Sequence, residues 1–367
     1  MKKFALVFVL LAVLICLLAC VGPYIPLLLP SVEGAWSPVW SSDGRYIAYE
    51  CVMLGFPDLP NIIFDEFADY YLRDICVYDQ LVNENIRLTK DRSPSSMPSW
   101  SPSGDKLAWL KWIEGSDDIL VIWDISGSEV KQFQSSIPLW GSDRHLDWSE
   151  DGKSIFIDNG VVFDVKNEIF TSVAIPTGNL DVCCFAWSPD GNYVAYRQVK
   201  NVDSDYRRHW QVIIAKDYEI LFVDDLEANV GDPYLQWSPD SSILAWRADR
   251  GGNSLLILRY PVEDKTNYIQ IGNGLGFSGI EWSPSSNQIA LRFLDQIAIV
   301  EPPSGADDLS LTIVEPQMIS LHGDSFNGLA WSPDEKMIAY ETSWQEGSQI
   351  WLLQIETLEN IPLTESN

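Results

Sequence analysis

The stretch Trp187–Tyr196, which reads WSPDGNYVAY, carries the pattern that decides the fold. Its central residues are those of a tight β-hairpin turn. Pro presets φ at the second turn position, Asp accepts hydrogen bonds from nearby backbone, and Gly tolerates positive φ. The apolar run Val194, Ala195 and Tyr196 then predicts a strand that is covered on both faces. The stretch therefore indicates a strand ending in Trp-Ser, a tight turn and a second, buried strand.

The same pattern occurs seven times along the 367-residue chain. Successive copies are 60, 48, 39, 50, 45 and 49 residues apart, and Ser follows Trp in every copy. The central apolar position is Ala in six copies. A side chain that small lets a large one approach closely, and we expect it to be the Trp of a neighbouring unit. The motif tryptophans are Trp40, Trp100, Trp148, Trp187, Trp237, Trp282 and Trp331.

A third strand, and usually a fourth, follows each hairpin. Third strands are clearest at residues 75–78, 119–123, 212–214, 255–258, 296–300 and 350–355. Four strands in roughly 40–45 residues, repeated radially, form the blade of a β-propeller. We therefore predict an all-β, seven-bladed propeller of four-stranded antiparallel blades, each contiguous in sequence. Six blades plus a degenerate cap is the alternative, because the 39-residue unit at Trp148 is the weakest.

The repeats resemble those of TolB-type propellers, a WD-like family whose blades carry W-S-P-D-G-x-x-I-A-F and often end in Leu-Thr. Leu88-Thr89 and Leu363-Thr364 match that ending. The resemblance runs from about Trp36 to the C-terminus and implies the propeller fold. We divide the chain into a lipoprotein signal peptide over 1–19, a linker or tether over 20–34, and the propeller over 35–367.

The first twenty residues have the layout of an export signal. A short basic start is followed by an apolar run over residues 4–19 and then by Cys20. The letters LLAC that end at Cys20 resemble the bacterial lipoprotein box, in which the signal is cut before a cysteine that becomes lipid-modified. We expect an exported protein anchored to the cell membrane or envelope, at its outer face or in the periplasm, through a lipid on Cys20. An uncleaved membrane anchor and a plain cleaved signal are the alternatives.

The composition is strongly acidic. Lys and Arg number 24 against 52 Asp and Glu, so the formal net charge is −28, and it becomes −30 once residues 1–19 are removed. A nucleic-acid-binding face needs clustered Lys and Arg, so no nucleic-acid partner is expected. Apolar residues make up 46% of the chain, which is enough for a sizeable core.

Export places the cysteines in a compartment where disulfides form. Cys51 and Cys76 fall on adjacent predicted strands of one sheet, so a bridge between them is possible and stays open. Cys183 and Cys184 are neighbours, for which a bridge is strained, and we expect them to be buried, unbridged apolar side chains. No Cys or His spacing indicates a metal site, and we expect neither metal nor cofactor.

Aromatic and acidic residues gather in the loops that join second to third strands and in a loop between blades. In a propeller these loops share one rim, where exposed aromatics can anchor a partner or stack on a sugar. The alternatives are that the tryptophans cap their own blades and that the acids serve solubility. The candidate binding rim comprises Trp112, Asp117, Asp118, Trp140, Asp143, Trp210, Trp344 and Glu346.

The sequence gives little support to catalysis. Its three histidines lie in separate predicted blades, and it has no G-x-S-x-G elbow of the kind found in propeller-bearing peptidases of the prolyl oligopeptidase group. We predict a monomeric, non-enzymatic binding or scaffolding module with an envelope protein as partner. The alternatives are a carbohydrate- or peptide-binding propeller with its site at the channel mouth and, less favoured, a hydrolase or lyase.

Overall fold

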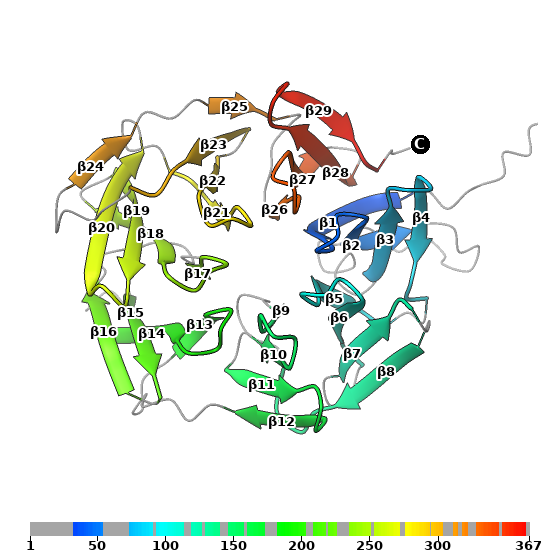
Figure 1. Ribbon diagram of the computed structural model, residues 1–367, viewed down its shortest axis with the longest axis horizontal. Helices are drawn as coiled ribbons and strands as arrows, with labels where there is room; N and C mark the ends of the chain where they lie inside the picture. The colour runs from blue at the N-terminus through cyan, green and yellow to red at the C-terminus, as the bar shows by residue number, and fades with distance from the viewer. Residues whose placement is uncertain are drawn as a thin grey trace, which may run out of the picture.

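Seven β-sheets surround one axis in the computed structural model, which confirms the all-β, seven-bladed propeller (Figure 1). The predicted signal peptide and Cys20 lie outside the described residues. The described part of the chain contains no helix long and apolar enough to cross a membrane. The structure describes residues 32–53, 73–90, 93–113, 119–126, 129–139, 146–157, 160–172, 182–202, 208–217, 219–225, 235–250, 253–271, 276–293, 295–303, 311–314, 318–321, 328–344 and 347–364.

The first three blades each have four antiparallel strands in chain order from the axis outward. Blade 3 is complete although it is the shortest repeat, so the six-blade alternative does not apply. Blade 1 comprises β1 (Val32–Trp40), β2 (Tyr46–Met53), β3 (Asp74–Asp79) and β4 (Glu84–Arg87). Blade 2 comprises β5 (Ser95–Trp100), β6 (Lys106–Lys111), β7 (Ile119–Asp124) and β8 (Glu129–Gln134). Blade 3 comprises β9 (Leu146–Trp148), β10 (Ser154–Ile157), β11 (Val161–Asp164) and β12 (Ile169–Ser172).

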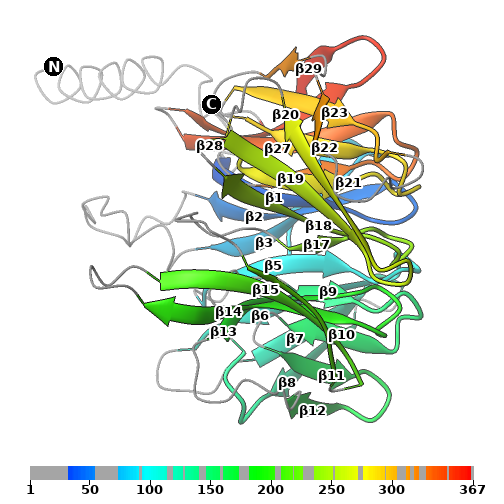
Figure 2. The same cartoon turned by 90° about the vertical axis from the view of Figure 1, so that its left-hand side faces the viewer.

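Blades 4 to 7 repeat the arrangement, and the strands cross the thickness of the ring (Figure 2). Blade 4 comprises β13 (Val182–Trp187), β14 (Val194–Val202), β15 (Arg208–Lys216) and β16 (Glu219–Asp225). Blade 5 comprises β17 (Gln236–Trp237), β18 (Leu244–Arg250), β19 (Asn253–Tyr260) and β20 (Lys265–Ile271). Blade 6 comprises β21 (Gly279–Trp282), β22 (Ile289–Arg292), β23 (Gln296–Val300) and β25 (Met318–Ser320). Blade 7 comprises β26 (Leu329–Trp331), β27 (Met337–Trp344), β28 (Gly347–Gln354) and β29 (Glu359–Pro362).

One strand departs from the predicted plan. β24 (Leu311–Val314) lies between β23 and β25 in sequence, yet it pairs parallel with β20 and gives blade 5 a fifth strand. Tyr268 lies opposite Leu311, and Ile271 lies opposite Val314. The outer edge of blade 5 is therefore covered by a segment of the chain that belongs to the next repeat.

The hydrogen bonds of the motif serine explain why all seven copies have Ser at this position. In every blade its hydroxyl accepts a hydrogen bond from the backbone N–H five residues further on, which closes the hairpin. In most blades the same hydroxyl donates to the motif aspartate, as Ser188 does to Asp190 at 2.6 Å. The residue three beyond the serine has positive φ in all seven blades, where Gly is the least strained choice. Four of those seven residues are Gly, and the others are Ser241, Ser286 and Glu335.

Adjacent blades are joined by one repeated contact, which we call the indole latch. The indole Nε1 of a motif Trp donates to the backbone carbonyl of the residue before the motif Trp of the preceding blade. Trp100, for example, donates to Val39 at 3.2 Å and packs with Ala48, which confirms the expected approach of Trp to the small Ala. Six latches form, from Trp40, Trp100, Trp148, Trp237, Trp282 and Trp331, at 3.0–3.3 Å.

The ring closes between blades 7 and 1 through contacts of side chains, and no described strand is exchanged between the two blades. At this seam, which we call seam 7/1, Trp40 latches onto the carbonyl of Ala330 at 3.1 Å. The Glu341 carboxylate accepts a hydrogen bond from the backbone N–H of Ser37 at 2.9 Å. A mixed cluster that includes Tyr49 of blade 1 and Ile350 of blade 7 fills the space between the sheets.

Two findings concern the cysteines. Cys51 and Cys76 form a disulfide between β2 and β3, which settles the possibility that the sequence left open. Cys184 is buried, but it is disulfide-bonded, so the expectation of an unbridged side chain is wrong for this residue. Cys184 has φ of 64° at a β-bulge. The expectation rested on the strain of a bridge between neighbouring cysteines in a regular strand, and the strand is irregular at such a bulge.

Candidate functional site

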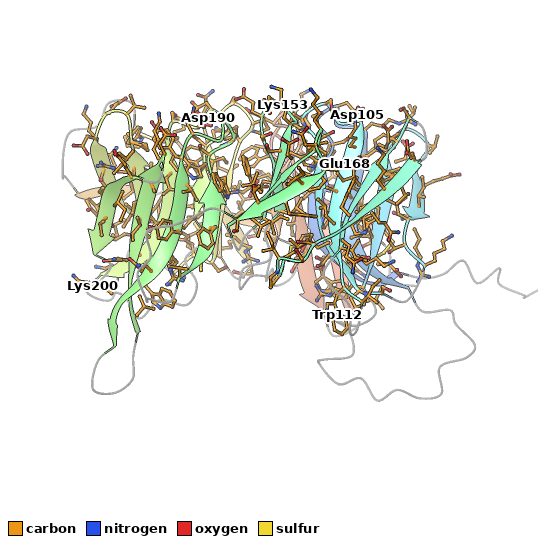
Figure 3. The ribbon with its side chains drawn as sticks, turned by 90° about the horizontal axis from the view of Figure 1, so that it is seen from below. Asp105, Trp112, Lys153, Glu168, Asp190 and Lys200 are labelled. Carbon is orange, nitrogen blue, oxygen red and sulfur yellow. A yellow bond between two sulfur atoms is a disulfide. The ribbon has the colours of Figure 1, made fainter. Side chains whose placement is uncertain are left out.

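The ring has two distinct faces, and the turns of the motif hairpins all lie on one of them. Figure 3 shows Asp105, Lys153 and Asp190 of the hairpin face along one edge, and Trp112 and Lys200 along the other. The loops of the predicted binding rim belong to this second face.

The predicted rim is described only in part. Trp112 is partly buried, and its backbone N–H donates to Pro94 at 2.9 Å. Trp210 is partly buried, and the guanidinium of Arg197 lies 4.6 Å from its ring centroid. These two tryptophans belong to blades 2 and 4, and the rim as one shared surface stays a prediction. Of Trp344 only the backbone is described, and Asp117, Asp118, Trp140, Asp143 and Glu346 lie outside the described residues.

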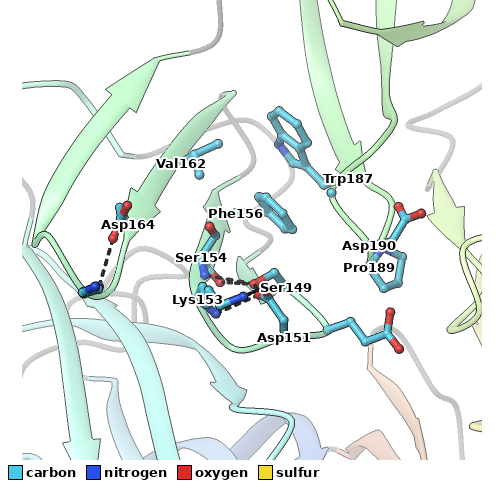
Figure 4. A pocket seen from close by; sticks show the side chains of 13 residues that line it. Ser149, Asp151, Lys153, Ser154, Phe156, Val162, Asp164, Trp187, Pro189 and Asp190 are labelled. Carbon is cyan, nitrogen blue, oxygen red and sulfur yellow. Dashed lines mark hydrogen bonds and ion pairs between the residues drawn. The ribbon is translucent and has the colours of Figure 1, made fainter.

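A pocket of about 710 Å³ opens on the hairpin face between blades 3 and 4, at what we call seam 3/4. Figure 4 shows its floor, where Phe156 and Trp187 lie against each other, and its polar walls. None of the residues predicted for the binding rim lines this pocket. The lining residues are Ser149, Glu150, Asp151, Lys153, Ser154, Phe156, Val162, Asp164, Lys166, Trp187, Pro189, Asp190 and Gly191.

One side chain accounts for the pocket. Phe156 occupies the motif position that is Ala in the six other copies. Its ring stacks on the Trp187 ring with centroids 4.9 Å apart and planes 10° apart. A phenyl ring thus occupies the position at which the other blades have Ala, and it packs against the Trp of the next blade.

The indole latch is missing at this seam. At each of the six latches, the accepting carbonyl belongs to the residue that pairs with the motif Ala of its own blade. In blade 3 the corresponding pair is Asp147 with Phe156. Trp187 Nε1 is nevertheless buried with no acceptor among the described residues. A buried indole N–H usually finds a partner, and leaving one unsatisfied costs about 1–3 kcal/mol. What joins the blades instead is the ring stack and a hydrogen bond from the Glu150 N–H to Pro189 at 2.8 Å.

The acids in the walls are held in the ionised form. A hydrogen bond from Lys153, with help from Ser149, lowers the pKa of Asp151 to about 2. Backbone and side-chain N–H groups of Asn167 lower the pKa of Asp164. Desolvation opposes ionisation of Asp190, but hydrogen bonds from Ser188 and Asn192 outweigh it and lower its pKa. The pocket therefore presents carboxylates around an aromatic floor at neutral pH.

The two lysines of the pocket offset only part of this negative charge. Lys153 is bound to Asp151 at 2.5 Å and so neutralises that carboxylate. Lys166 lies in the wall with Glu150, Asp164 and Asp190. No His or Cys lines the pocket, and no metal-binding group of three or more His, Cys, Asp or Glu occurs among the described residues. This chemistry suits the binding of a group that is cationic at one end and flat or apolar at the other.

A buried titratable group, Glu341, lies at seam 7/1. Burial raises the pKa of Glu341 to about 7, and its Ser37 and Arg292 neighbours only partly oppose that rise. Glu50 occupies the same motif position in blade 1 and accepts from the Met97 N–H of blade 2 at 3.0 Å. Both carboxylates therefore hold the left-handed backbone of the next blade's first strand, at Ser37 and Met97. Their role is to join blades.

A signal for the seam 3/4 pocket was present in the sequence. The blade 3 motif reads WSEDGKSIFI, so Phe156 breaks a position at which every other repeat has Ala. Glu150 likewise replaces the motif Pro found in five of the other copies. The consequence depends on which neighbouring side chain enters that space, and this is visible only once the blades are placed side by side.

Comparison with known proteins shows the fold and little more. No protein-family model matches the chain. The uncharacterised peptidase YuxL of Bacillus subtilis (strain 168) is 27% identical over 127 residues, which are 35% of this chain and 17% of that protein. The match thus spans about a sixth of the length of that relative.

Solved propellers of different functions superpose on the whole ring. The propeller domain of the trilobed protease from Pyrococcus furiosus, described as having an open velcro topology, has a TM-score of 0.60 at 13% identity and covers 92% of this chain and 98% of its own. An oligogalacturonate lyase with manganese has a TM-score of 0.61 at 13% identity, with coverages of 89% and 91%. The Cps50 (Swd1) propeller of Myceliophteria thermophila has a TM-score of 0.59 at 11% identity, with coverages of 87% and 97%.

Proposed function

We propose that this chain is a non-enzymatic binding module of the bacterial cell envelope. In this proposal a TolB-like propeller is exported, tethered to the membrane through a lipid on Cys20, and holds an envelope protein by a basic side chain seated in the seam 3/4 pocket. The observation that carries the proposal is the pocket itself, with its Phe156–Trp187 floor and its ionised walls.

The chemistry of the pocket supports a Lys or Arg side chain as the bound group. Such a side chain combines an apolar stem with a cationic head, so the stem can lie on the aromatic floor while the head meets Glu150, Asp164 or Asp190. A cation over an aromatic face contributes roughly 0.5–2 kcal/mol. The formal net charge of −28 attracts a basic partner from a distance and speeds the encounter.

A matched pair of substitutions tests the pocket. Asp190→Asn removes a pocket carboxylate, whereas Asp240→Asn makes the same change at the same motif position of blade 5, away from the pocket. Both aspartates accept similar hydrogen bonds from their own hairpins, so the effect on folding is matched. In a pull-down from envelope extracts, Asp190→Asn is expected to lose the partners that Asp240→Asn retains. Equal recovery by the two variants contradicts the pocket as the binding site.

The membrane tether has its own test. Labelled palmitate is expected to be incorporated into the full-length chain and to be lost in Cys20→Ala. Incorporation that survives this substitution contradicts the lipid anchor while leaving the pocket proposal intact.

A second candidate function is the binding of a small carbohydrate or peptide by the same pocket. The stacked pair of Phe156 and Trp187 favours it, because a sugar ring stacks on such a surface as readily as an alkyl stem does. Calorimetric titration with neutral oligosaccharides and with short lysine-containing peptides separates the two candidates. Turnover of either ligand would favour the hydrolase or lyase alternative instead.

A further inference from the structure

The outer edges of two neighbouring blades differ in a way that reveals a docking surface. β20 is the fourth strand of blade 5, and β24 covers its edge as a parallel fifth strand. Ile269 and Ile271 of β20 are buried. β16 is the fourth strand of blade 4, and no described strand pairs with its outer edge. Both strands lie on the outside of the ring (Figure 1).

The uncovered strand is apolar. Ile220, Leu221 and Val223 are 45%, 51% and 45% exposed, which makes β16 the densest run of exposed large apolar side chains on the described surface. The fourth strands of blades 1, 2, 3 and 7 each expose one such side chain. A strand edge with unpaired N–H and C=O groups and apolar side chains is a template for pairing, and natural proteins usually protect such an edge.

We propose that β16 accepts an extended segment of a partner protein as a fifth strand, in the way that β20 accepts β24. The sequence of β24, Leu-Thr-Ile-Val, shows the kind of segment that this ring accepts at a blade edge: short, extended and rich in β-branched apolar residues. In such strand addition the main-chain hydrogen bonds supply affinity, and alternate side chains supply specificity.

The negative charge of this chain indicates which kind of segment pairs with β16. The exposed Glu219 precedes the apolar run of β16, and the whole chain is strongly acidic. A second copy of this chain would bring like charges together at a shared edge, which is unfavourable. A partner segment with Lys or Arg beside its apolar core complements the negative charge of this chain. This surface goes beyond the seam 3/4 pocket and does not need it.

The probe is a synthetic peptide, Lys-Lys-Leu-Thr-Ile-Val-Lys-Lys, titrated into the full folded chain. A second peptide of equal charge has Pro in place of Thr and Val, and Pro cannot donate the ladder hydrogen bonds. Either peptide can also place a Lys in the seam 3/4 pocket, so the readout is hydrogen exchange of the amides in residues 219–225, which only the first peptide is expected to slow. The peptide concentration that gives half of this protection measures the affinity of the β16 edge. Equal protection by both peptides, or no protection by the first, overturns the proposal.

Variants locate the site. Leu221→Ser combined with Val223→Ser is expected to weaken the first peptide about tenfold or more, because each lost apolar contact removes of the order of 1 kcal/mol. Val130→Ser is the matched control on β8, where the side chain is also 51% exposed, and it is expected to bind as the wild type does. Equal weakening by the control overturns the assignment to β16.

Two further outcomes are decisive. Phe156→Ala, which alters the seam 3/4 pocket, is expected to leave the protection of residues 219–225 by the first peptide unchanged, so failure of the pocket and failure of the edge are distinguishable. If sedimentation shows a dimer of the chain that the Leu221→Ser and Val223→Ser double variant abolishes, the occupant is a second copy and the proposed partner segment is wrong.

Discussion

Seam 7/1 and seam 3/4 join neighbouring blades of the same ring, but different contacts hold them. At seam 7/1 the Trp40 latch is present, the buried Glu341 carboxylate accepts a hydrogen bond from Ser37 in the first strand of blade 1, and the two blades share a core cluster. At seam 3/4 the latch of Trp187 is missing, and a pocket of about 710 Å³ takes its place. The seam that joins the two ends of the propeller is the better bonded of the two.

The difference has a physical reason. Blades 3 and 4 follow each other along the chain, so the covalent linkage keeps them close even when the seam opens. No described strand is shared between blades 7 and 1, which are held together by contacts such as those of Trp40 and Glu341, and separating them opens the ring. Loss of the indole latch therefore destabilises the ring less at seam 3/4 than at seam 7/1. This allows an internal seam to serve as a binding site, since function is often located where some stability is given up.

The largest expected loss of stability is that of Trp40→Ala, and Trp187→Ala is its comparison. Both side chains are partly buried, but only Trp40 forms a latch. Trp40→Ala is expected to lower the free energy of unfolding by about 3 kcal/mol or more. Trp187→Ala is expected to cost about 1 kcal/mol less, because no hydrogen bond is lost. Denaturant unfolding measures both, and equal losses contradict the proposed difference between the seams.

The next effect depends on pH and concerns Glu341. Its pKa is raised from 4.5 to about 7 in the folded chain, so its protonated form is the one that folding favours. The stabilisation linked to this group is fully present below pH 4.5 and is lost as the pH rises to about 7 and above. Glu341→Gln mimics the neutral form, and its stability relative to the wild type is expected to rise across that window by about 3 kcal/mol.

Unfolding curves of the two proteins at pH 4.5 and pH 8 check this prediction. Asp334→Asn is a control in the same blade, because the Ser332 hydrogen bond lowers the pKa of Asp334 from 3.8. The stability linked to Asp334 therefore changes only below about pH 4, and the difference between this variant and the wild type is expected to be the same at pH 4.5 and pH 8. A stability difference between Glu341→Gln and the wild type that does not change with pH contradicts a buried, raised-pKa carboxylate at seam 7/1.

A smaller effect is expected from copying the seam 3/4 defect to the next seam. Ala195→Phe places a phenyl ring where Trp237 now packs and donates to Ala186 at 3.0 Å. Overpacking of this kind costs about 1–3 kcal/mol, and the Trp237 latch is expected to break. Unchanged stability, with the latch intact in a crystal structure, contradicts the steric account of the seam 3/4 pocket.

Much of the fold was predictable because each repeat carries its own turn chemistry. The Ser, Asp and Gly of the motif form local hydrogen bonds and φ values that do not depend on the rest of the chain. The pairing of β24 with β20 was not predictable, because a short apolar segment does not indicate which distant edge it joins. The disulfide-bonded state of Cys184 was missed because the bulge around it was not visible in the sequence.

The candidate site was harder to predict than the fold. The rim residues were chosen for their chemical type and loop position, and most of them lie outside the described residues. Phe156 was visible as an exception to the Ala position, but its effect depends on Trp187, 31 positions further along the chain and in the next blade. Contacts between blades are long-range facts, and a repeat pattern describes only what happens within each blade.

A crystal structure of Phe156→Ala tests the central claim most directly. If Phe156 alone holds the latch open, removing its ring lets Trp187 move inward, and its Nε1 is expected to lie within 3.0–3.3 Å of the carbonyl oxygen of Asp147, as in the six other latches. The pocket is expected to shrink in the same structure. A Trp187 that keeps its present position, with its indole N–H still unbonded and the pocket unchanged, would contradict the account.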